Sequence, residues 1–272
     1  MMSRIDSALT VASLQMVSTP DLQQNLDVSR QMIREAAGHG ARLVVLPEYF
    51  CMMGNRDLEK VKIAEHLGEG PIQQFLADQA RENSIYLIAG TMPLLSDEEN
   101  KVYNATLVFN PQGERIARYD KIHLFRFQKG TDRYDESEVL SPGRQPAVAD
   151  IDGLKVGLSV CYDLRFPELY RSMGPVDIIA LPAAFVYTTG MAHWEVLIRA
   201  RAIENQCYFL SCGQGGVHAN GRRTWGHSMW VNPWGEVENM LGEGQGIVLG
   251  RFDPAKINDM RTSLPALSHR VL

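Results

Sequence analysis

The chain alternates between short apolar runs and longer stretches with helical spacing of apolar positions. Apolar runs bounded by turn residues are typical of buried strands. They predict strands over residues 9–16, 43–46, 85–91, 154–160, 177–181, 207–212 and 247–252. The helical spacing and the proline positions predict five helices. These are expected from an N-cap at Thr19 to Gly38 or Gly40, from Pro71, from Pro167, over 193–205 and over 254–262.

Three turn sequences lie between apolar segments and predict hairpins. NPQG separates residues 102–109 from 114–119, DG separates 148–151 from 154–160, and NPWG separates 227–231 from 236–241. Residues 125–146 show no strong period and are rich in charge, Gly and Pro, so we expect a functional loop there. No linker, repeat or low-complexity segment interrupts the pattern, which predicts an α/β fold and a single domain over residues 1–272. The pattern alone leaves open a doubly wound sheet or two stacked sheets.

The charge and hydrophobicity of the chain bear on whether it binds nucleic acid or a membrane. The net charge is −5, with 22% charged and 45% hydrophobic residues, and this balance predicts no nucleic-acid partner. No apolar stretch approaches the roughly 18 residues of a membrane span, so we expect no membrane partner. The first ten residues lack the apolar core of a signal peptide, and the 4 cysteines are scattered. A reducing, cytoplasmic location is therefore expected.

Cys161 lies between the apolar run at 156–160 and the helix that Pro167 opens. We expect it on a turn after the carboxyl end of a strand, where open α/β sheets bind their ligands. Backbone N–H groups and the positive end of a helix would favour a thiolate there. A buried cysteine alone is nevertheless more often inert than nucleophilic.

Two further polar residues follow predicted strands. Glu48 comes after the apolar sequence LVVLP, and Lys121 comes after the hairpin at 102–119. Taken singly, Glu48 would be read as a structural partner and Lys121 as a surface lysine. Taken together with Cys161, they place an acid, an amine and a thiol at strand ends that could converge on one pocket.

These stretches resemble the nitrilase superfamily of carbon–nitrogen hydrolases. Glu48 in LPEYF, Lys121 in YDKIHLF and Cys161 in SVCYDLRFPELYR match the family's Glu-Lys-Cys motifs in order, and Glu136 in YDESEVLSPG matches a further family glutamate. The similarity extends through PAAFVYTTGMAHWEVLIRARAIENQCY and WGHSMWVNPWGE to SLPALSHR, and so covers nearly the whole chain. It is strongest to the branch of deaminated glutathione amidases and ω-amidases.

The resemblance implies a four-layer α-β-β-α sandwich and a reaction without metal or cofactor. The expected substrate is a small carboxamide, hydrolysed through a thioester with release of ammonia. Cys161 would be the nucleophile and Glu48 the acid and base, while Glu136 would orient Lys121 or the leaving nitrogen. Lys121 and the backbone N–H of Tyr162 would hold the oxyanion.

The resemblance also implies a homodimer, formed through the helix after Cys161 and the helix at 193–205. The second helix carries Trp194, Leu197, Ile198 and Ile203, which is more apolar surface than one sheet face needs.

Several residues near the motifs are candidates for binding the substrate. Arg165 is expected to clamp a substrate carboxylate with its planar fork, the alternative being an ion pair with Glu168 or Asp163. Asp163 is expected to be a structural turn residue. Tyr162 is taken as a binding residue through its backbone N–H, and Phe185 and Thr189 are expected either to line the pocket or to pack in the core.

Other functions remain open at this point. The acyl group could pass to an amine instead of water, the enzyme could be an ω-amidase, or the fold could serve as a non-catalytic binding protein. A Cys-His protease is disfavoured because Cys161 lies mid-chain without the protease signatures, so His193 and His227 are read as structural. The sequence has no closely spaced pairs of Cys and His, so no zinc site is expected.

Overall fold

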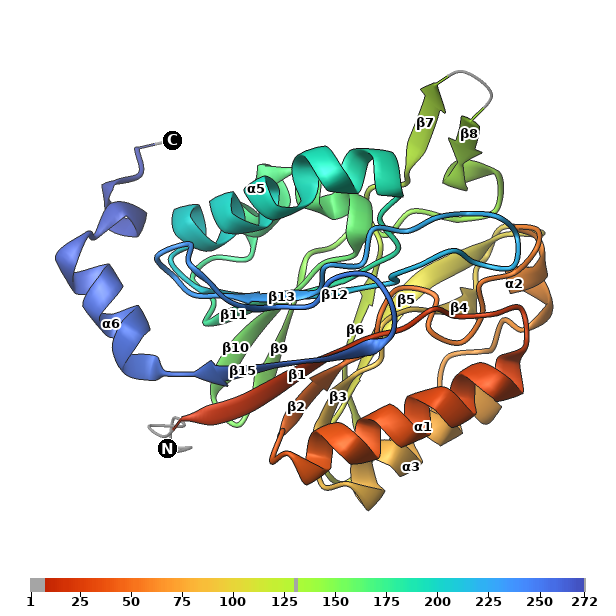
Figure 1. The fold of residues 1–272 in the computed structure, drawn as a ribbon, viewed down its shortest axis with the longest axis horizontal. Coiled ribbons are helices and arrows are strands. Elements are labelled where there is room, and N and C mark those ends of the chain that lie inside the picture. Colours follow the sequence, from red (N-terminus) through yellow and green to blue (C-terminus); the bar gives the residue numbers. More distant parts are fainter. Residues whose placement is uncertain (1–7, 130–131, 272) are drawn as a thin grey trace.

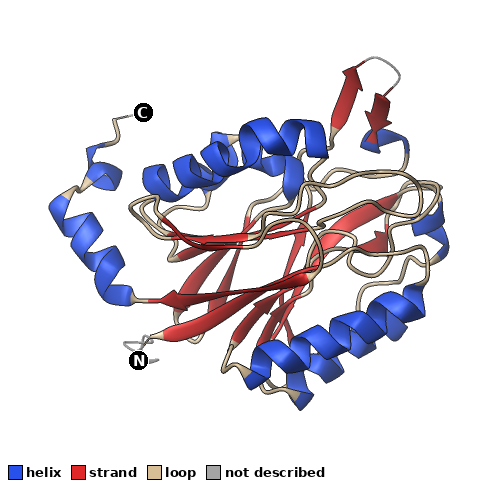
Figure 2. Cartoon of the chain, viewed as in Figure 1, coloured by secondary structure: helices blue, strands red, loops and turns tan. Residues whose placement is uncertain are grey.

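The computed structural model describes residues 8–129 and 132–271. Two β-sheets stack face to face in the middle of the molecule, and helices cover the outer face of each (Figures 1 and 2). This is a four-layer α-β-β-α sandwich, as expected from the resemblance. Stacking is favoured because each sheet buries one apolar face against the other and its second face under helices.

The first sheet has seven strands in the order β15-β1-β2-β3-β5-β4, and β6 pairs with β5 outside this order. β1, β2 and β3 run parallel, and β15 pairs antiparallel with β1. The strands are β1 Leu9–Gln15, β2 Leu43–Val45, β3 Tyr86–Ile88, β4 Met92–Leu95, β5 Val102–Phe109, β6 Arg115–Asp120 and β15 Gly246–Phe252.

The second sheet has six strands in the order β14-β13-β12-β11-β10-β9. β10, β11 and β12 run parallel, so their carboxyl ends lie at one edge of the sheet. The strands are β9 Ala147–Ile151, β10 Leu154–Leu158, β11 Ile178–Ala183, β12 Tyr208–Gly213, β13 Met229–Val231 and β14 Val237–Met240. A separate hairpin, β7 Arg126–Lys129 and β8 Asp132–Asp135, projects beyond the sandwich (Figure 1).

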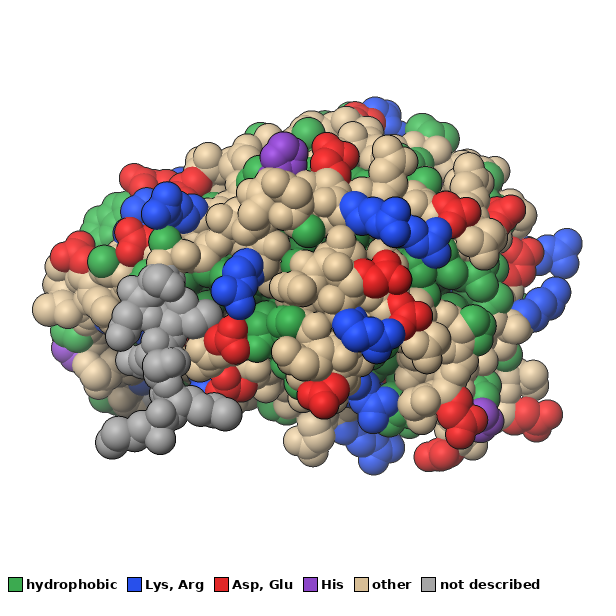
Figure 3. All heavy atoms as spheres, turned by 90° about the horizontal axis from the view of Figure 1, so that it is seen from below, with side chains coloured by type: hydrophobic (Ala, Val, Ile, Leu, Met, Phe, Trp, Pro, Cys, Tyr) green, Lys and Arg blue, Asp and Glu red, His purple; other side chains and the backbone are tan. Residues whose placement is uncertain are grey.

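Helices α1 and α3 cover the first sheet, whereas α4 and α5 lie over the second (Figure 1). The helices are α1 Leu22–Gly38, α2 Glu59–Lys62, α3 Pro71–Glu82, α4 Pro167–Ser172, α5 Tyr187–Asn205 and α6 Pro254–Ser263. Short 3₁₀ helices span Glu136–Glu138, Cys161–Arg165 and Ala266–His269. On the face that carries α1 and α3, side chains of both charges are interspersed (Figure 3). No helix in the described part of the chain is both long and apolar enough to span a bilayer.

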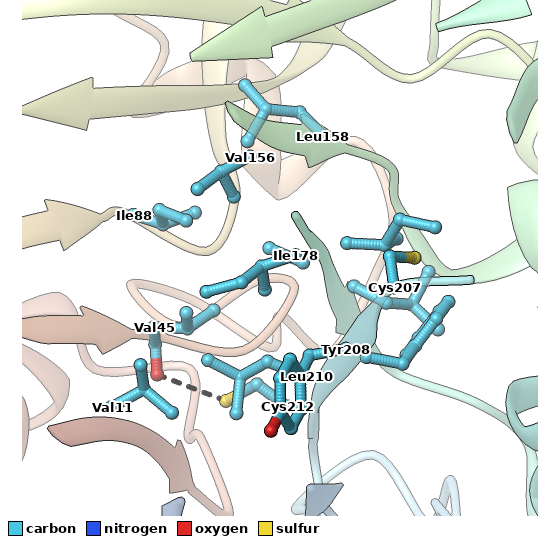
Figure 4. Packing of buried hydrophobic residues seen from close by; sticks show 14 of the residues in the cluster. Val11, Val45, Ile88, Val156, Leu158, Ile178, Cys207, Tyr208, Leu210 and Cys212 are labelled. Atoms are coloured by element: carbon cyan, nitrogen blue, oxygen red, sulfur yellow. Dashed lines mark hydrogen bonds between the residues drawn. The ribbon is translucent and has the colours of Figure 1, made fainter. Parts of the chain in front are cut away.

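Alternate residues of the first sheet face opposite layers. Val45 points into the core between the sheets, while its neighbour Val44 packs in the core under α1 and α3. Figure 4 shows the inter-sheet core, where Val11, Val45 and Ile88 face side chains of β10, β11 and β12. Cys212 lies in this core, and its Sγ donates to the carbonyl of Val45 at 3.2 Å. Burial on both faces explains why these parallel strands appear as continuous apolar runs.

The structure corrects several boundaries. The N-cap of helix α1 is Asp21 rather than Thr19, because the Asp21 side chain accepts the Gln24 N–H of the first turn. Helix α5 begins at Tyr187, six residues before the predicted start. Part of the predicted loop at 125–146 forms the β7–β8 hairpin, while strand β4 and helix α2 were not predicted.

Candidate active site

Cys161 begins a 3₁₀ helix three residues after β10 ends, at the carboxyl edge of the parallel strands. Its φ of 49° places it in the left-handed region, which a non-glycine residue rarely adopts. Tyr49, directly after Glu48, has a φ of 58°. Strained turns of this kind persist where the surrounding structure holds them, and they are concentrated at functional sites.

Lys121 joins two of the predicted residues in a buried ion-pair cluster. Its Nζ donates to Oε1 of Glu48 at 2.9 Å and to both oxygens of Glu136 at 2.9 and 2.8 Å. Lys121 and Glu48 are both buried, with side chains 0% and 1% exposed. Such a pair is tolerated in a protein interior only when further hydrogen bonds satisfy the remaining polar atoms.

Neighbouring donors supply those hydrogen bonds to both carboxylates. For Glu48, Oε1 accepts from the side-chain amide of Asn104 at 2.8 Å, and Oε2 accepts from the backbone N–H of Ala184 at 2.7 Å. For Glu136, Oε1 accepts from the Tyr49 hydroxyl at 3.0 Å and Oε2 from the Phe125 N–H at 2.7 Å. The two hydrogen bonds from Lys121 to Glu136 are the contact that the predicted orienting role would require.

The surroundings of the cluster favour a protonated thiol at Cys161 and a protonated amine at Lys121. Burial raises the pKa of Cys161 well above its usual value, and the nearby Glu48 carboxylate raises it further, against the opposing effect of Lys121. Burial alone would lower the pKa of Lys121, but Glu136 and Glu48 outweigh burial and raise it. The resting site therefore holds a neutral thiol beside a charged ammonium, and an attack by sulfur requires a base that takes its proton.

A cavity with about 250 Å³ of empty space opens above the thiol. All four predicted substrate-binding residues line it together with Cys161 and Glu136. The remaining lining residues are Phe125, Ala184, Val186 and Arg222. A partly apolar cleft with a few convergent polar groups is the usual form of a small-molecule site.

Asp163 ties the turn of Cys161 to the segment that carries Lys121. Its carboxylate accepts from the Val160 N–H at 2.8 Å, the Tyr119 hydroxyl at 2.7 Å and the His123 N–H at 3.1 Å. The His123 ring, with Nδ1 2.7 Å from Asp163, stacks on Phe166 with centroids 3.7 Å apart. Asp163 is thus the structural turn residue that was expected.

Comparison with known proteins identifies the family. The family model described as "Carbon-nitrogen hydrolase" matches residues 10–262. The chain belongs to this family. It is 38% identical over 266 residues to the deaminated glutathione amidase of Synechocystis sp. (strain PCC 6803 / GT-S), covering 96% of this chain and 97% of that protein.

Solved structures of this superfamily share the fold. The structure of Saccharomyces cerevisiae Nit3, a member of branch 10 of the nitrilase superfamily, matches with a TM-score of 0.88 and 32% identity and covers 100% of both chains. The Caenorhabditis elegans NitFhit structure matches with a TM-score of 0.88 and 34% identity, covering 97% of this chain and 65% of that one. As a carbon–nitrogen hydrolase, this chain is an enzyme that acts on amides.

The structure places the other predicted residues of this hydrolase as follows. Arg165 packs its guanidinium against the rings of Phe185 and Tyr162, 5.1 and 5.7 Å from their centroids, and its Nη1 lies 3.2 Å from Nδ1 of His193. Within the described residues it makes no ion pair with Glu168 or Asp163. Phe185 is at once a core residue and a pocket residue, since it packs on Trp194 and lines the cavity. The Thr189 hydroxyl donates to the Val186 carbonyl at 3.4 Å, which is long for a hydrogen bond.

Several residues of the site were not predicted from the sequence. Tyr49, Asn104 and His123 contact the cluster or its supports, and Arg222 lines the pocket. Tyr49 and His123 lie inside the motifs LPEYF and YDKIHLF, so their positions were a usable signal. Asn104 and Arg222 lie outside those motifs, on strand β5 and on the 214–226 segment.

Proposed function

We propose that this enzyme hydrolyses an amide through a thioester on Cys161 and that deaminated glutathione is its substrate. The observation that supports the chemistry is the cluster in which Lys121 pairs with Glu48 and with Glu136, because Glu136 lines the same pocket as Cys161. The identity over nearly the full length of a deaminated glutathione amidase supports the substrate.

The reaction follows from the positions of these groups. Glu48 accepts the thiol proton while Sγ attacks the amide carbon, and the oxyanion lies between the Lys121 ammonium and the Tyr162 N–H. The Tyr162 N–H has no acceptor among the described residues, so it is free for this task. Glu48 then protonates the leaving nitrogen as the C–N bond breaks. A water deprotonated by Glu48 attacks the thioester, and the acid leaves as Cys161 regains its proton.

The leaving group depends on the amide. A primary carboxamide releases ammonia, whereas deaminated glutathione releases the amine of a peptide.

The test of the substrate measures acid formation from deaminated glutathione, α-ketoglutaramate, α-ketosuccinamate and simple nitriles. We expect deaminated glutathione to have the highest kcat/KM. A preference for α-ketoglutaramate would support the ω-amidase alternative, and no acid from any amide would overturn the proposal.

Arg165 is proposed to bind the carboxylate beside the keto group of the substrate. It lines the pocket, and no carboxylate of the described chain neutralises it. Because a charged hydrogen bond contributes about 1.5–3 kcal/mol, Arg165→Met should lower kcat/KM for acidic amides at least about tenfold. Neutral amides of the same length should lose far less. An equal loss for matched acidic and neutral amides would show that Arg165 is structural.

We propose a homodimer that uses the outer face of α5. Trp194 and Ile198, which the sequence suggested for this surface, instead lie in the core of their own chain. Met191, Val196 and Ile203 are exposed, at 63, 64 and 44%, and remain available. Exposed apolar groups gathered on one element are typical of an interface. Light scattering at low micromolar concentration should give the mass of a dimer, and Val196→Glu should shift it towards the monomer; a stable wild-type monomer would contradict this.

A cytoplasmic location is proposed as well. The cysteines Cys51, Cys161, Cys207 and Cys212 are all free, and a free thiol is needed in the site. Thiols persist in reducing compartments. Cell fractionation that recovered the enzyme outside the cytoplasm would contradict this location.

A further inference from the structure

A second arginine, Arg222, lines the pocket that Cys161 and Arg165 line. It comes from the segment 214–226, which leads from the end of β12 towards β13. Its Nη2 donates to the carbonyl of Ala184 at 3.0 Å, and its guanidinium lies 5.3 Å from the ring centroid of Tyr134. The side chain is therefore held in place without a ligand.

Arg222 has no counter-ion of its own in the described part of the chain. Its buried Nε makes no hydrogen bond, and the two nearby glutamates, Glu48 and Glu136, pair with Lys121 instead. Burial alone would lower the pKa of Arg222, but Tyr49, Glu48 and the other acidic groups of the site outweigh burial and raise it, so the guanidinium stays charged. None of these groups pairs with it directly, so it can still donate to an anionic group bound in the pocket.

The adjacent arginine shows what a structural role looks like on this segment. Arg223 donates to both oxygens of Glu243 at 2.9 and 3.1 Å and lies 3.6 Å from the ring centroid of Tyr187. It does not line the cavity that Arg222 lines. Arg223 is therefore neutralised by a carboxylate of the protein, whereas Arg222 lines the cavity without forming such a pair.

Arg222 and Arg165 are held by different groups. The rings of Tyr162 and Phe185 and the imidazole of His193 surround Arg165, whereas the Ala184 carbonyl and the Tyr134 ring hold Arg222. The cavity thus offers two separately anchored guanidiniums around one thiol. Each presents N–H groups suited to a carboxylate.

We propose that Arg222 is a second carboxylate-binding residue and that the enzyme selects amides with a carboxylate on each side of the scissile bond. Arg165 would bind the carboxylate of the acyl part and Arg222 that of the leaving amine. This inference rests on the proposed amide hydrolysis. Deaminated glutathione fits it chemically, because it carries one carboxylate beside its keto group and another on its terminal glycine.

The test compares deaminated glutathione with its C-terminal amide, which lacks only the carboxylate of the leaving part. Arg222→Met should lower kcat/KM for deaminated glutathione at least about tenfold, mainly through KM, and should change the value for the C-terminal amide less than about threefold. Arg165→Met should lower both values. Arg223→Met is the matched control and should leave the ratio of the two values unchanged. Equal losses on both substrates in Arg222→Met would overturn the proposal.

Binding separates this inference from the proposed function. Calorimetry with the non-reactive Cys161→Ala variant should show at least about tenfold tighter binding of deaminated glutathione than of its C-terminal amide, and Arg222→Met in that background should remove the difference. Arg222→Lys, which keeps the charge but loses the fork, is used if Arg222→Met does not fold, and it should retain part of the difference. A difference as large as in the Cys161→Ala parent, in either Arg222 variant, would overturn the carboxylate assignment. A wild type that binds both ligands but hydrolyses neither would overturn only the proposed function.

Discussion

Replacing Cys161 with alanine is expected to lower kcat for amide hydrolysis by at least about ten-thousand-fold, because no other group in the pocket can form the acyl intermediate. The residual rate would come from Lys121 and the Tyr162 N–H acting on a bound amide. The fold should survive, since the change removes one buried atom, and the expected loss of stability is about 1–2 kcal/mol.

Steady-state kinetics and thermal unfolding of the same preparation check both parts of this prediction. Cys212→Ala is a control for the loss of a buried thiol, because Cys212 lies in the inter-sheet core and bonds to carbonyls of Leu14 and Val45. It should lower stability while leaving kcat within about threefold. More than a trace of turnover in Cys161→Ala would show that the covalent mechanism is wrong.

The second large effect is expected from Glu48→Gln. Three donors surround this carboxylate, namely the Lys121 ammonium, the Asn104 amide and the Ala184 N–H. A glutamine has one acceptor oxygen and one NH₂ group, so it must turn its NH₂ towards at least one donor. The variant should therefore lose about 1–3 kcal/mol of stability through a buried polar group without a partner.

Activity should fall further than stability in this variant. Glu48 is proposed to move a proton in both acylation and deacylation, and the thiol has a raised pKa. A loss of about ten-thousand-fold in kcat is expected, at the upper end of the range for one positioned acid–base group. Glu243→Gln, which changes an exposed glutamate, should leave kcat unaffected. If Glu48→Gln retained more than about a tenth of wild-type kcat, Glu48 would be only the counter-ion of Lys121.

The strands were predicted well because burial on both faces leaves an unmistakable apolar run. β2 and β12 lie within a residue of the predicted ends. Helix α5 was predicted too short because its first turn, Tyr187 to Gly190, has low helix propensity and no side-chain cap at Val186. The β7–β8 hairpin escaped notice because its strands are four residues long and charged.

Some residues of the candidate site were likewise predicted from the sequence, and others were missed. Glu48, Lys121, Glu136 and Cys161 lie in short motifs, and the structure brings them together. Asn104 contacts Glu48, which lies 56 residues earlier in the chain. Arg222 contacts Ala184, which lies 38 residues earlier. The first contact joins segments of the first sheet, on β5 and after β2, and the second joins segments that follow β11 and β12 of the second sheet. Such contacts depend on the order of the strands within each sheet, which a single sequence does not report.

Mass spectrometry of the enzyme quenched during turnover of a slowly hydrolysed amide tests the covalent mechanism most directly. Wild-type protein should gain the mass of the acyl group, and peptide mapping should place it on Cys161, with none on Cys51, Cys207 or Cys212. The Cys161→Ala variant should gain no mass under the same conditions. An acyl group on another residue, or continued turnover of Cys161→Ala without any adduct, would contradict the thioester mechanism.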